Sequence, residues 1–250
     1  MRLPASFLTR PIAHRALHDG NDVRPENSLS AVRAAIDSGY GIEIDLQLSS
    51  DGEAMVFHDY SLDRMTAESG LVRDRTAEEL GRIDLKGSAE RIPRLEDVLA
   101  VVDGQVPLLI ELKDQDGALG PDVGPLEQAV ADALASYDGD VAVMSFNPHS
   151  VLLLKALLPA TPRGLTTEDF VLADDWDISR PRRQELNQIG DAEAADVCFI
   201  SHSHRHLAMG RVNELKGGGM TILCWTVKSP EEEAEARKVA DNVTFEGYLA

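Results

Sequence analysis

Short apolar runs alternate along this chain with longer stretches in which apolar residues recur at helical spacing. In the run IEIDLQL at 42–48, apolar and polar residues alternate, so Ile42, Ile44 and Leu46 share one face of a predicted strand. At 28–38 the apolar positions instead recur every three or four residues, which predicts an amphipathic helix. These two patterns follow one another along most of the chain.

About eight strands are predicted in this way, and helices separate most of them. Strands are expected at 12–16, 42–48, 107–113, 141–146, 163–165, 197–200, 220–227 and 242–246, with a further one at 53–59 after the Asp51-Gly52 turn. Helices are expected at 28–38, 95–103, 125–136, 148–158, 204–217 and 230–240. This order indicates parallel βα units, and both a closed barrel and an open doubly wound sheet fit it.

The chain length suits one large domain or two small ones. An α/β barrel commonly fills the 250 residues present here, and 43% of them are hydrophobic, enough for a sizeable core. The distribution of glycine and proline marks no linker, and no short-period repeat is present. We therefore expect a single domain over residues 1–250.

The formal net charge of −19 limits the partners that this protein can take. Such an excess of carboxylates repels polyanions, so nucleic-acid binding is not expected, and adsorption to an anionic bilayer is disfavoured. No apolar run is long enough for a membrane span, and the first residues lack the apolar core of a signal peptide. We expect a cytoplasmic protein without stable membrane insertion, and the sequence carries no signal for an oligomeric state.

Charged and polar residues gather at the ends of the predicted strands, where α/β barrels place their catalytic groups. A charged side chain within an apolar strand is costly unless it is paired or bound to a cation. One such acid is more often part of a structural salt bridge, but acids at successive strand ends favour a functional site. Read in order, these ends carry His14, Arg15, Glu43, Asp45, His58, Asp59, Glu111, Lys113 and Trp225.

Three of these residues suggest a metal site. Glu43 and Asp45 are two residues apart, so on a strand both side chains leave the same face. Together with Glu111 they would form a site of carboxylate oxygens. Such a site suits Ca²⁺ or Mg²⁺, whereas Zn²⁺ usually takes more nitrogen or sulfur ligands.

The basic residues suggest chemistry on a phosphate. His14 and His58 are candidate proton carriers, because imidazole titrates near neutral pH. Arg15 offers a planar, permanently charged group suited to a phosphate, and Lys113 adds a second positive charge near Glu111. A lone histidine in a strand is more often a hydrogen-bonded core residue. The combination of both histidines with a cation site suits cleavage of a phosphodiester.

Five sequence segments together resemble a known family signature. They are AHRA at 13–16, RPENS at 24–28, IEIDLQLSSDGEAMVFHD at 42–59, LIELK at 109–113 and CWTV at 224–227. In this order they resemble the HRG, PENT, E-x-D, DG, HD, E-x-K and W-T-V elements of the glycerophosphodiester phosphodiesterase family. The resemblance covers most of the chain and is densest between residues 12 and 66.

The resemblance implies a (β/α)₈ TIM barrel with a small insertion over its mouth, at about 60–94. It also implies metal-dependent hydrolysis of a glycerophosphodiester to sn-glycerol 3-phosphate and an alcohol, through a cyclic phosphate. In this family pattern, His14 and His58 are the general base and acid, Arg15 holds the phosphate and Lys113 stabilises charge. Glu43, Asp45 and Glu111 bind Ca²⁺ or Mg²⁺, and Trp225 lines the glycerol or head-group side, although core packing explains this tryptophan equally well.

Some positions depart from the family pattern or leave their role open. Ala16 replaces the usual glycine, Lys228 replaces asparagine after W-T-V, and the C-terminal segment differs, so Glu246 is expected to have no family counterpart. Asn27, beside Glu26, either supports the site or caps the first helix.

Further polar residues are expected outside the site. We expect His18 in a solvent-exposed loop, with contact to substrate as the alternative. We expect Arg64 on a solvated, salt-bridged surface of the 60–94 segment, with guidance of an anionic substrate as the alternative. The histidines at 202, 204 and 206 are expected at the surface or supporting the site.

Two other functions are compatible with the same residues. A phospholipase-like phosphodiesterase would use the same histidines and metal on lysophospholipids or phosphoinositides, but the sequence shows no clear apolar rim for a lipid. A non-catalytic phosphate-binding barrel would be expected to lack a histidine or a metal carboxylate, and all of them are present.

Overall fold

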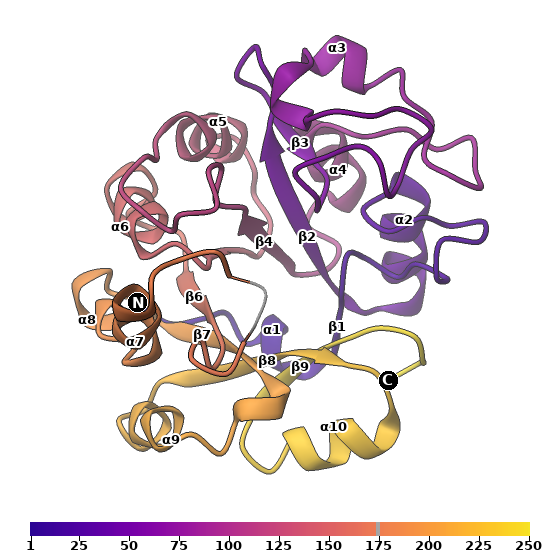
Figure 1. The fold of residues 1–250 in the computed structure, drawn as a ribbon. Helices are drawn as coiled ribbons and strands as arrows, with labels where there is room; N and C mark the ends of the chain where they lie inside the picture. Colours follow the sequence, from indigo (N-terminus) through magenta and orange to yellow (C-terminus); the bar gives the residue numbers. More distant parts are fainter. Residues whose placement is uncertain (174–175) are drawn as a thin grey trace.

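Eight parallel strands close into a barrel in the computed structural model, which describes residues 1–173 and 176–250 (Figure 1). The ring closes because β1 pairs with both β2 and β9. Its strands are β1 (Ile12–Ala13), β2 (Gly41–Leu48), β4 (Leu108–Leu112), β5 (Val141–Ser145), β6 (Arg163–Thr167), β7 (Phe199–Ser203), β8 (Thr221–Val227) and β9 (Asn242–Phe245). The predicted TIM barrel is thereby confirmed, and the open doubly wound sheet is wrong.

Helices lie outside this ring and cover its strands (Figure 1). They are α2 (Leu29–Ser38), α4 (Leu95–Val102), α5 (Pro125–Leu134), α6 (Pro148–Leu157), α7 (Arg180–Asn187), α8 (Asp191–Ala194), α9 (Gly210–Gly217) and α10 (Pro230–Ala236). The helix predicted at 204–217 begins later, because His204–His206 form a separate 3₁₀ turn, η2. Among the described residues, no helix is both long and apolar enough to cross a membrane.

The alternation along the strands sorts side chains between two environments. Ile42, Ile44 and Leu46 of β2 belong to the main core between strands and helices. Leu109 of β4 faces the other way and joins a second cluster, to which the N-terminal segment with α1 (Ser6–Thr9) contributes Phe7. The full second cluster is Leu3, Phe7, Ile12, Leu109, Ala142, Met144, Phe199 and Leu223. It fills the barrel interior below the strand ends.

The packing of the barrel interior depends on a glycine, Gly164. A Cβ atom at Gly164 of β6 would collide with the ring of Phe199 on the neighbouring strand β7. Phe199 is fully buried, so its ring occupies the space that a larger residue at 164 would need. The absence of a side chain at this position therefore lets a large aromatic ring fill the barrel.

A short strand and a long segment lie beside the barrel. Strand β3 (Ala54–Val56) pairs antiparallel with β2, so the strand predicted at 53–59 is shorter and lies outside the ring. The segment from β3 to α4 contains η1 (Val72–Asp74) and α3 (Ala77–Leu80). It buries its own apolar cluster of Met55, Phe57, Leu62, Met65, Val72, Ala77, Leu80, Leu85 and Ile92. This packing holds the segment next to the carboxyl end of β2 (Figure 1).

Candidate active site

Three buried carboxylates meet at the carboxyl ends of β2 and β4. Asp45 pairs in register with Glu111, and Glu43 lies two residues earlier on β2, on the same face. Ligand oxygens of the three residues lie within 4.8 Å of one another, and all three residues are buried. Such a cluster of hard oxygen donors fits a divalent cation.

Lys113 forms ion pairs with two of the three carboxylates. Lys113 Nζ lies 2.7 Å from Asp45 Oδ1 and 2.5 Å from Glu111 Oε1. Burial works to raise the pKa of Asp45, but the nearby positive charges, that of Lys113 foremost and with it those of the histidines and Arg15, together outweigh it and hold that pKa well below its usual range. Burial, together with the charges of Asp45 and Glu111, raises the pKa of Glu43 well above its ordinary value. A divalent cation bound between the three carboxylates would relieve the repulsion that Lys113 leaves uncompensated. The donor set therefore fits a metal.

The turn after β1 brings Arg15 to the same cluster. Arg15 has a φ of 52°, in the left-handed region, so the chain turns sharply and β1 is shorter than predicted. Its backbone N–H donates to Glu43 Oε2 at 2.9 Å. Its side chain donates to Glu26 Oε1 at 2.8 Å, and its Nε lies 3.6 Å from Asp45 Oδ2. The guanidinium therefore lies between two carboxylates at the edge of the acidic cluster.

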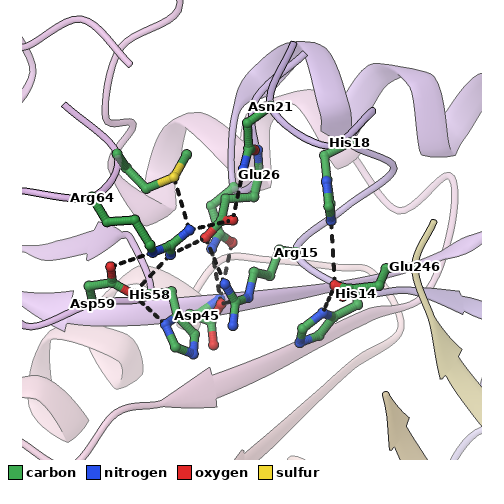
Figure 2. Close-up of polar contacts among 12 residues, drawn as sticks. His14, Arg15, His18, Asn21, Glu26, Asp45, His58, Asp59, Arg64 and Glu246 are labelled. Atoms are coloured by element: carbon green, nitrogen blue, oxygen red, sulfur yellow. Dashed lines mark hydrogen bonds and ion pairs between the residues drawn. The ribbon is translucent and has the colours of Figure 1, made fainter. Parts of the chain in front are cut away.

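His14 is held by a residue from the last barrel strand. Its Nδ1 lies 2.6 Å from Glu246 Oε2, directly after β9 (Figure 2). Lys228 Nζ lies 2.6 Å from the other oxygen of that carboxylate. Burial works to raise the pKa of Glu246, but the hydrogen bond with His14 and the contact with Lys228 hold it well below its usual value. A carboxylate only accepts, so Nδ1 carries the proton and Nε2 is left for proton exchange. Burial lowers the pKa of His14 below its ordinary value, although Glu246 opposes the shift.

His58 is held in the same manner on the other side. Its Nδ1 lies 2.7 Å from Asp59 Oδ1, so Asp59 accepts that proton and Nε2 is again left for proton exchange. Arg64 donates through Nε and Nη2 to the two oxygens of Asp59, at 2.6 and 2.9 Å. Burial works to raise the pKa of Asp59, but the hydrogen bonds with His58 and Arg64 hold it below its usual value.

The helix start at α2 supplies two further contacts. Ser28 is the N-cap, and its hydroxyl accepts from Ala31 N at 3.2 Å, so the capping role considered for Asn27 is wrong. Asn27 instead donates to Asp45 Oδ2 at 2.9 Å and accepts from the backbone of Asp45. It therefore supports the orientation of an acidic side chain in the cluster.

A cavity of about 100 Å³ collects most of these groups. Its walls include His14, Arg15, Glu43, His58, Glu111, Lys113, Phe146 and Trp225. A wider pocket of about 550 Å³ adjoins it and shares His58, Glu111, Lys113, Phe146 and Trp225 with it. Trp176, Tyr60 and Glu168 complete much of the wider pocket, and Trp176 packs 5.1 Å from Phe146 between ring centroids. The small polar cavity thus opens beside a larger, more aromatic one.

This geometry corrects the expectation for His18 and adds contacts for two other residues. His18 is not in open solvent, because its side chain is 11% exposed and lies 3.6 Å from Glu246. Glu246, which departs from the family pattern, contacts His14. Arg64 does not merely lie on a salt-bridged surface, since it contacts the partner of His58. Their sequence signal was weak because each contact joins segments that only the closed fold brings together.

The three clustered histidines have different surroundings. His202 lies on β7, is fully buried and shares a hydrogen bond of 2.8 Å between its Nδ1 and Thr167 Oγ1, so a surface position is wrong for it. His204 and His206 lie on η2 and are partly exposed. The three residues therefore do not act as one group.

The chain is similar to known phosphodiesterases over most of its length. Residues 14–242 match the model of the glycerophosphoryl diester phosphodiesterase family. The glycerophosphodiester phosphodiesterase of Caldanaerobacter subterraneus subsp. tengcongensis is 35% identical over 234 residues, 90% of this chain and 88% of that protein. A phosphodiesterase of Oleispira antarctica, solved in complex with the product sn-glycerol-3-phosphate, is 27% identical with a TM-score of 0.76, and the match covers 96% of this chain and 94% of that one.

Proposed function

Because the chain belongs to the glycerophosphoryl diester phosphodiesterase family, we propose that it hydrolyses glycerophosphodiesters to sn-glycerol 3-phosphate and an alcohol. The observation that carries this proposal is the cavity that brings His14 and His58 together with the acidic cluster and Arg15. The relative solved with sn-glycerol-3-phosphate supports the choice of product.

In this proposal His14 is the general base. Its lowered pKa keeps the imidazole neutral near pH 7, and the proton on Nδ1 is held by Glu246. Nε2 can then accept a proton from the attacking hydroxyl, either that of the substrate glycerol or that of water.

His58 is the general acid on the opposite side of the phosphate. Asp59 holds its Nδ1, which orients the ring so that Nε2 can give a proton to the oxygen of the departing alcohol. The two histidines thus exchange protons with the attacking and the departing oxygen. If the glycerol hydroxyl attacks first, the P–O bond to the alcohol breaks as the cyclic phosphate forms, and water then opens this ring to give sn-glycerol 3-phosphate.

Arg15 and Lys113 stabilise negative charge on the phosphate, and the wider pocket receives the alcohol. Both cations line the small cavity, while Trp225 and Phe146 form a wall common to both pockets. Trp225 Nε1 donates to Ser201 O at 2.9 Å, so its indole is fixed in that wall. A pocket of this size accepts alcohols of different sizes.

A divalent cation, Ca²⁺ or Mg²⁺, would be held by Glu43, Asp45 and Glu111, and when bound it would polarise a phosphoryl oxygen. Lys113 and Arg15 already contact this cluster, so the chain itself orients the carboxylates before any cation binds.

The decisive experiment incubates the purified protein with glycerophosphocholine and follows sn-glycerol 3-phosphate in a coupled assay. Parallel reactions contain EDTA, EDTA followed by excess Ca²⁺ or Mg²⁺, or the His14→Ala variant. We expect turnover that chelation stops, one of the two cations restores, and the substitution abolishes.

Absence of turnover with either cation would contradict the proposal as stated. Hydrolysis of lysophospholipids or phosphoinositides under the same conditions would then identify a phospholipase-like enzyme. Failure with these substrates as well would favour a non-catalytic phosphate-binding barrel.

A further inference from the structure

We propose that Arg64 is a positioning residue that joins the two sides of the site, by holding Asp59 against His58 and Glu26 against Arg15. The inference rests on the proposed function for the roles of His58 and Arg15, and on the geometry alone for the link between them. Figure 2 shows the Arg64 guanidinium between the two carboxylates.

Arg64 makes paired hydrogen bonds with both carboxylates at once. Nε and Nη2 reach the two oxygens of Asp59, while Nη2 and Nη1 reach the two oxygens of Glu26, at 2.6 and 3.0 Å. A planar guanidinium can present this many donors in a fixed arrangement, whereas an ammonium group is a single point of charge. The position therefore requires arginine, and lysine cannot replace all of its contacts.

Each carboxylate in turn contacts one group of the site. Asp59 accepts from His58 Nδ1 at 2.7 Å, and Glu26 accepts from Arg15 Nη1 at 2.8 Å. Arg64 is thus one residue removed from a proton-transfer group on one side and from a phosphate-binding group on the other. Asn21 also donates to Glu26 at 3.3 Å, but within the part of the chain that the structure describes it makes no hydrogen bond with His58 or Asp59.

The burial of the two partners separates this arrangement from an ordinary surface ion pair. Glu26 has a side chain only 7% exposed, and Asp59 is 23% exposed. Burial works to raise the pKa of Glu26, but hydrogen bonds from Arg64 and the charge of Arg15 lower it to about 2, so the carboxylate stays ionised. Loss of Arg64 would leave the buried Glu26 carboxylate with fewer charged partners, which is costly, and we expect Arg15 to shift in response.

The segment that carries Arg64 is itself anchored. Lys86 Nζ donates to the backbone carbonyls of Asp63 and Arg64 at 2.6 and 2.8 Å, and Met65 packs in the apolar cluster of the same segment. These contacts fix the backbone at Arg64, so its guanidinium starts from a defined position relative to Asp59 and Glu26. This explains why a segment outside the barrel can orient residues at the strand ends.

The test uses three variants and one control. Arg64→Met removes both pairs of hydrogen bonds, Asp59→Asn weakens the His58 side alone, and Glu26→Gln weakens the Arg15 side alone. Arg82→Met is the matched control, because Arg82 lies in the same segment, is exposed and pairs only with Glu78 among the described residues. With glycerophosphocholine we expect Arg64→Met to lose about 100-fold in kcat/KM, and the control to keep wild-type values.

The split between kcat and KM distinguishes positioning from a purely structural role. We expect Asp59→Asn to lower mainly kcat, Glu26→Gln to raise mainly KM, and Arg64→Met to do both. Arg64→Lys should recover at most one of the two parameters. The double variant Arg64→Met/Asp59→Asn should have a kcat within about twofold of the worse single variant, because both changes act on His58 through one link.

Phosphate binding tests the link without catalysis. Calorimetry with inorganic phosphate and with sn-glycerol 3-phosphate should show weaker binding in Arg64→Met and Glu26→Gln, and unchanged binding in Asp59→Asn. Urea unfolding of each variant checks that the fold is retained. Wild-type kcat, KM and phosphate affinity in Arg64→Met would overturn the inference. If the wild type hydrolysed no glycerophosphodiester, the proposed function would fall, and the phosphate-binding comparison would still decide whether Arg64 positions Arg15.

Discussion

His14 and Glu246 lie 232 positions apart in the chain, yet the Nδ1 of His14 is 2.6 Å from a carboxylate oxygen of Glu246. Closure of the barrel produces this contact, because His14 follows β1 and Glu246 follows β9, and these strands are paired. The last strand therefore fixes the orientation of a residue near the first.

Substitution of Glu246 by glutamine tests this relationship. A neutral amide can present either its oxygen or its NH₂ group to Nδ1, so it no longer fixes the tautomer, and it does not stabilise the positive charge that His14 gains on taking a proton. We expect kcat to fall roughly 10- to 100-fold, part of the ~10²–10⁴-fold that a general base contributes. Steady-state kinetics with glycerophosphocholine measures the loss, and Glu231→Gln, on the exposed side of α10, should leave kcat unchanged.

The same variant changes the pH dependence in a defined direction. His14 must be neutral to act as a base, so kcat/KM rises with pH through the pKa of His14 in the free enzyme. Burial lowers this pKa, and Glu246 opposes the shift. Removal of the carboxylate therefore lowers it further and should move the acidic limb of the profile to lower pH. A limb that moved to higher pH would contradict the assignment of His14 as the base.

Metal binding should be visible in stability as well as in activity. A ligand that binds only the folded state adds about 2.7 kcal/mol to the free energy of unfolding at a concentration of 100 Kd. We expect Ca²⁺ or Mg²⁺ to raise the Tm of the wild type and to have no effect on Asp45→Asn, measured by calorimetry after EDTA treatment. Asp132→Asn, an exposed change on α5, should respond as the wild type does. An equal rise in Tm for Asp45→Asn would place the cation elsewhere.

The buried His202 should make the protein less stable in mild acid. Burial lowers its pKa to about 4, below the ordinary value of 6.5, and the nearby His206 adds to this. Between these two pH values the unfolded chain binds a proton that the folded protein does not. The free energy of unfolding therefore falls as the pH drops, by about 1.4 kcal/mol per unit and about 3 kcal/mol across the window.

Urea unfolding of the wild type and His202→Gln at pH 7 and pH 4.5 measures this contribution. The difference between the two pH values should be smaller in the variant by roughly 2 kcal/mol, given the same slope per pH unit. His149→Gln, which removes a partly exposed histidine from α6, should retain the wild-type difference. An unchanged difference in His202→Gln would mean that His202 is protonated in the folded protein.

Packing inside the barrel can be tested at Gly164. An added methyl group there would meet the ring of Phe199, so Gly164→Ala should reduce the free energy of unfolding by about 1–3 kcal/mol. Gly190→Ala is the matched control, because nothing lies within 4 Å of a Cβ at that position and its φ is −72°. Equal stability of the two variants in urea would show that Phe199 can move at little cost.

Local patterns predicted the alternating strands and helices and the acidic cluster, whereas the choice of a closed barrel over an open sheet came from the family resemblance. Glu43 and Asp45 are two residues apart on one strand, and the register between β2 and β4 then places Asp45 beside Glu111. The apolar alternation of β2 likewise appears in the structure as residues that pack toward the helices. Patterns of this kind lie within one element or join neighbouring strands.

The remaining contacts depend on the closed fold and on loops. Arg64 approaches Glu26 only because its segment packs against β3, and a basic residue in a polar stretch reads equally well as a surface residue. For Asn27 the sequence left a supporting role and a capping role both open, because Ser28, the next residue, is an equally good N-cap and in the structure occupies that position. Glu246 departs from the family pattern, so neither pattern nor resemblance indicated its contact with His14.

The second apolar cluster, which fills the barrel interior and includes Leu3 and Phe7, has a kinetic consequence. It fills the barrel below the carboxylates, so substrate enters and both products leave at the carboxyl ends of the strands. If the alcohol occupies the wider outer pocket, as proposed, it departs first and the glycerol phosphate follows. We therefore expect ordered release, in which sn-glycerol 3-phosphate competes with the substrate for the empty enzyme while the alcohol inhibits without competing.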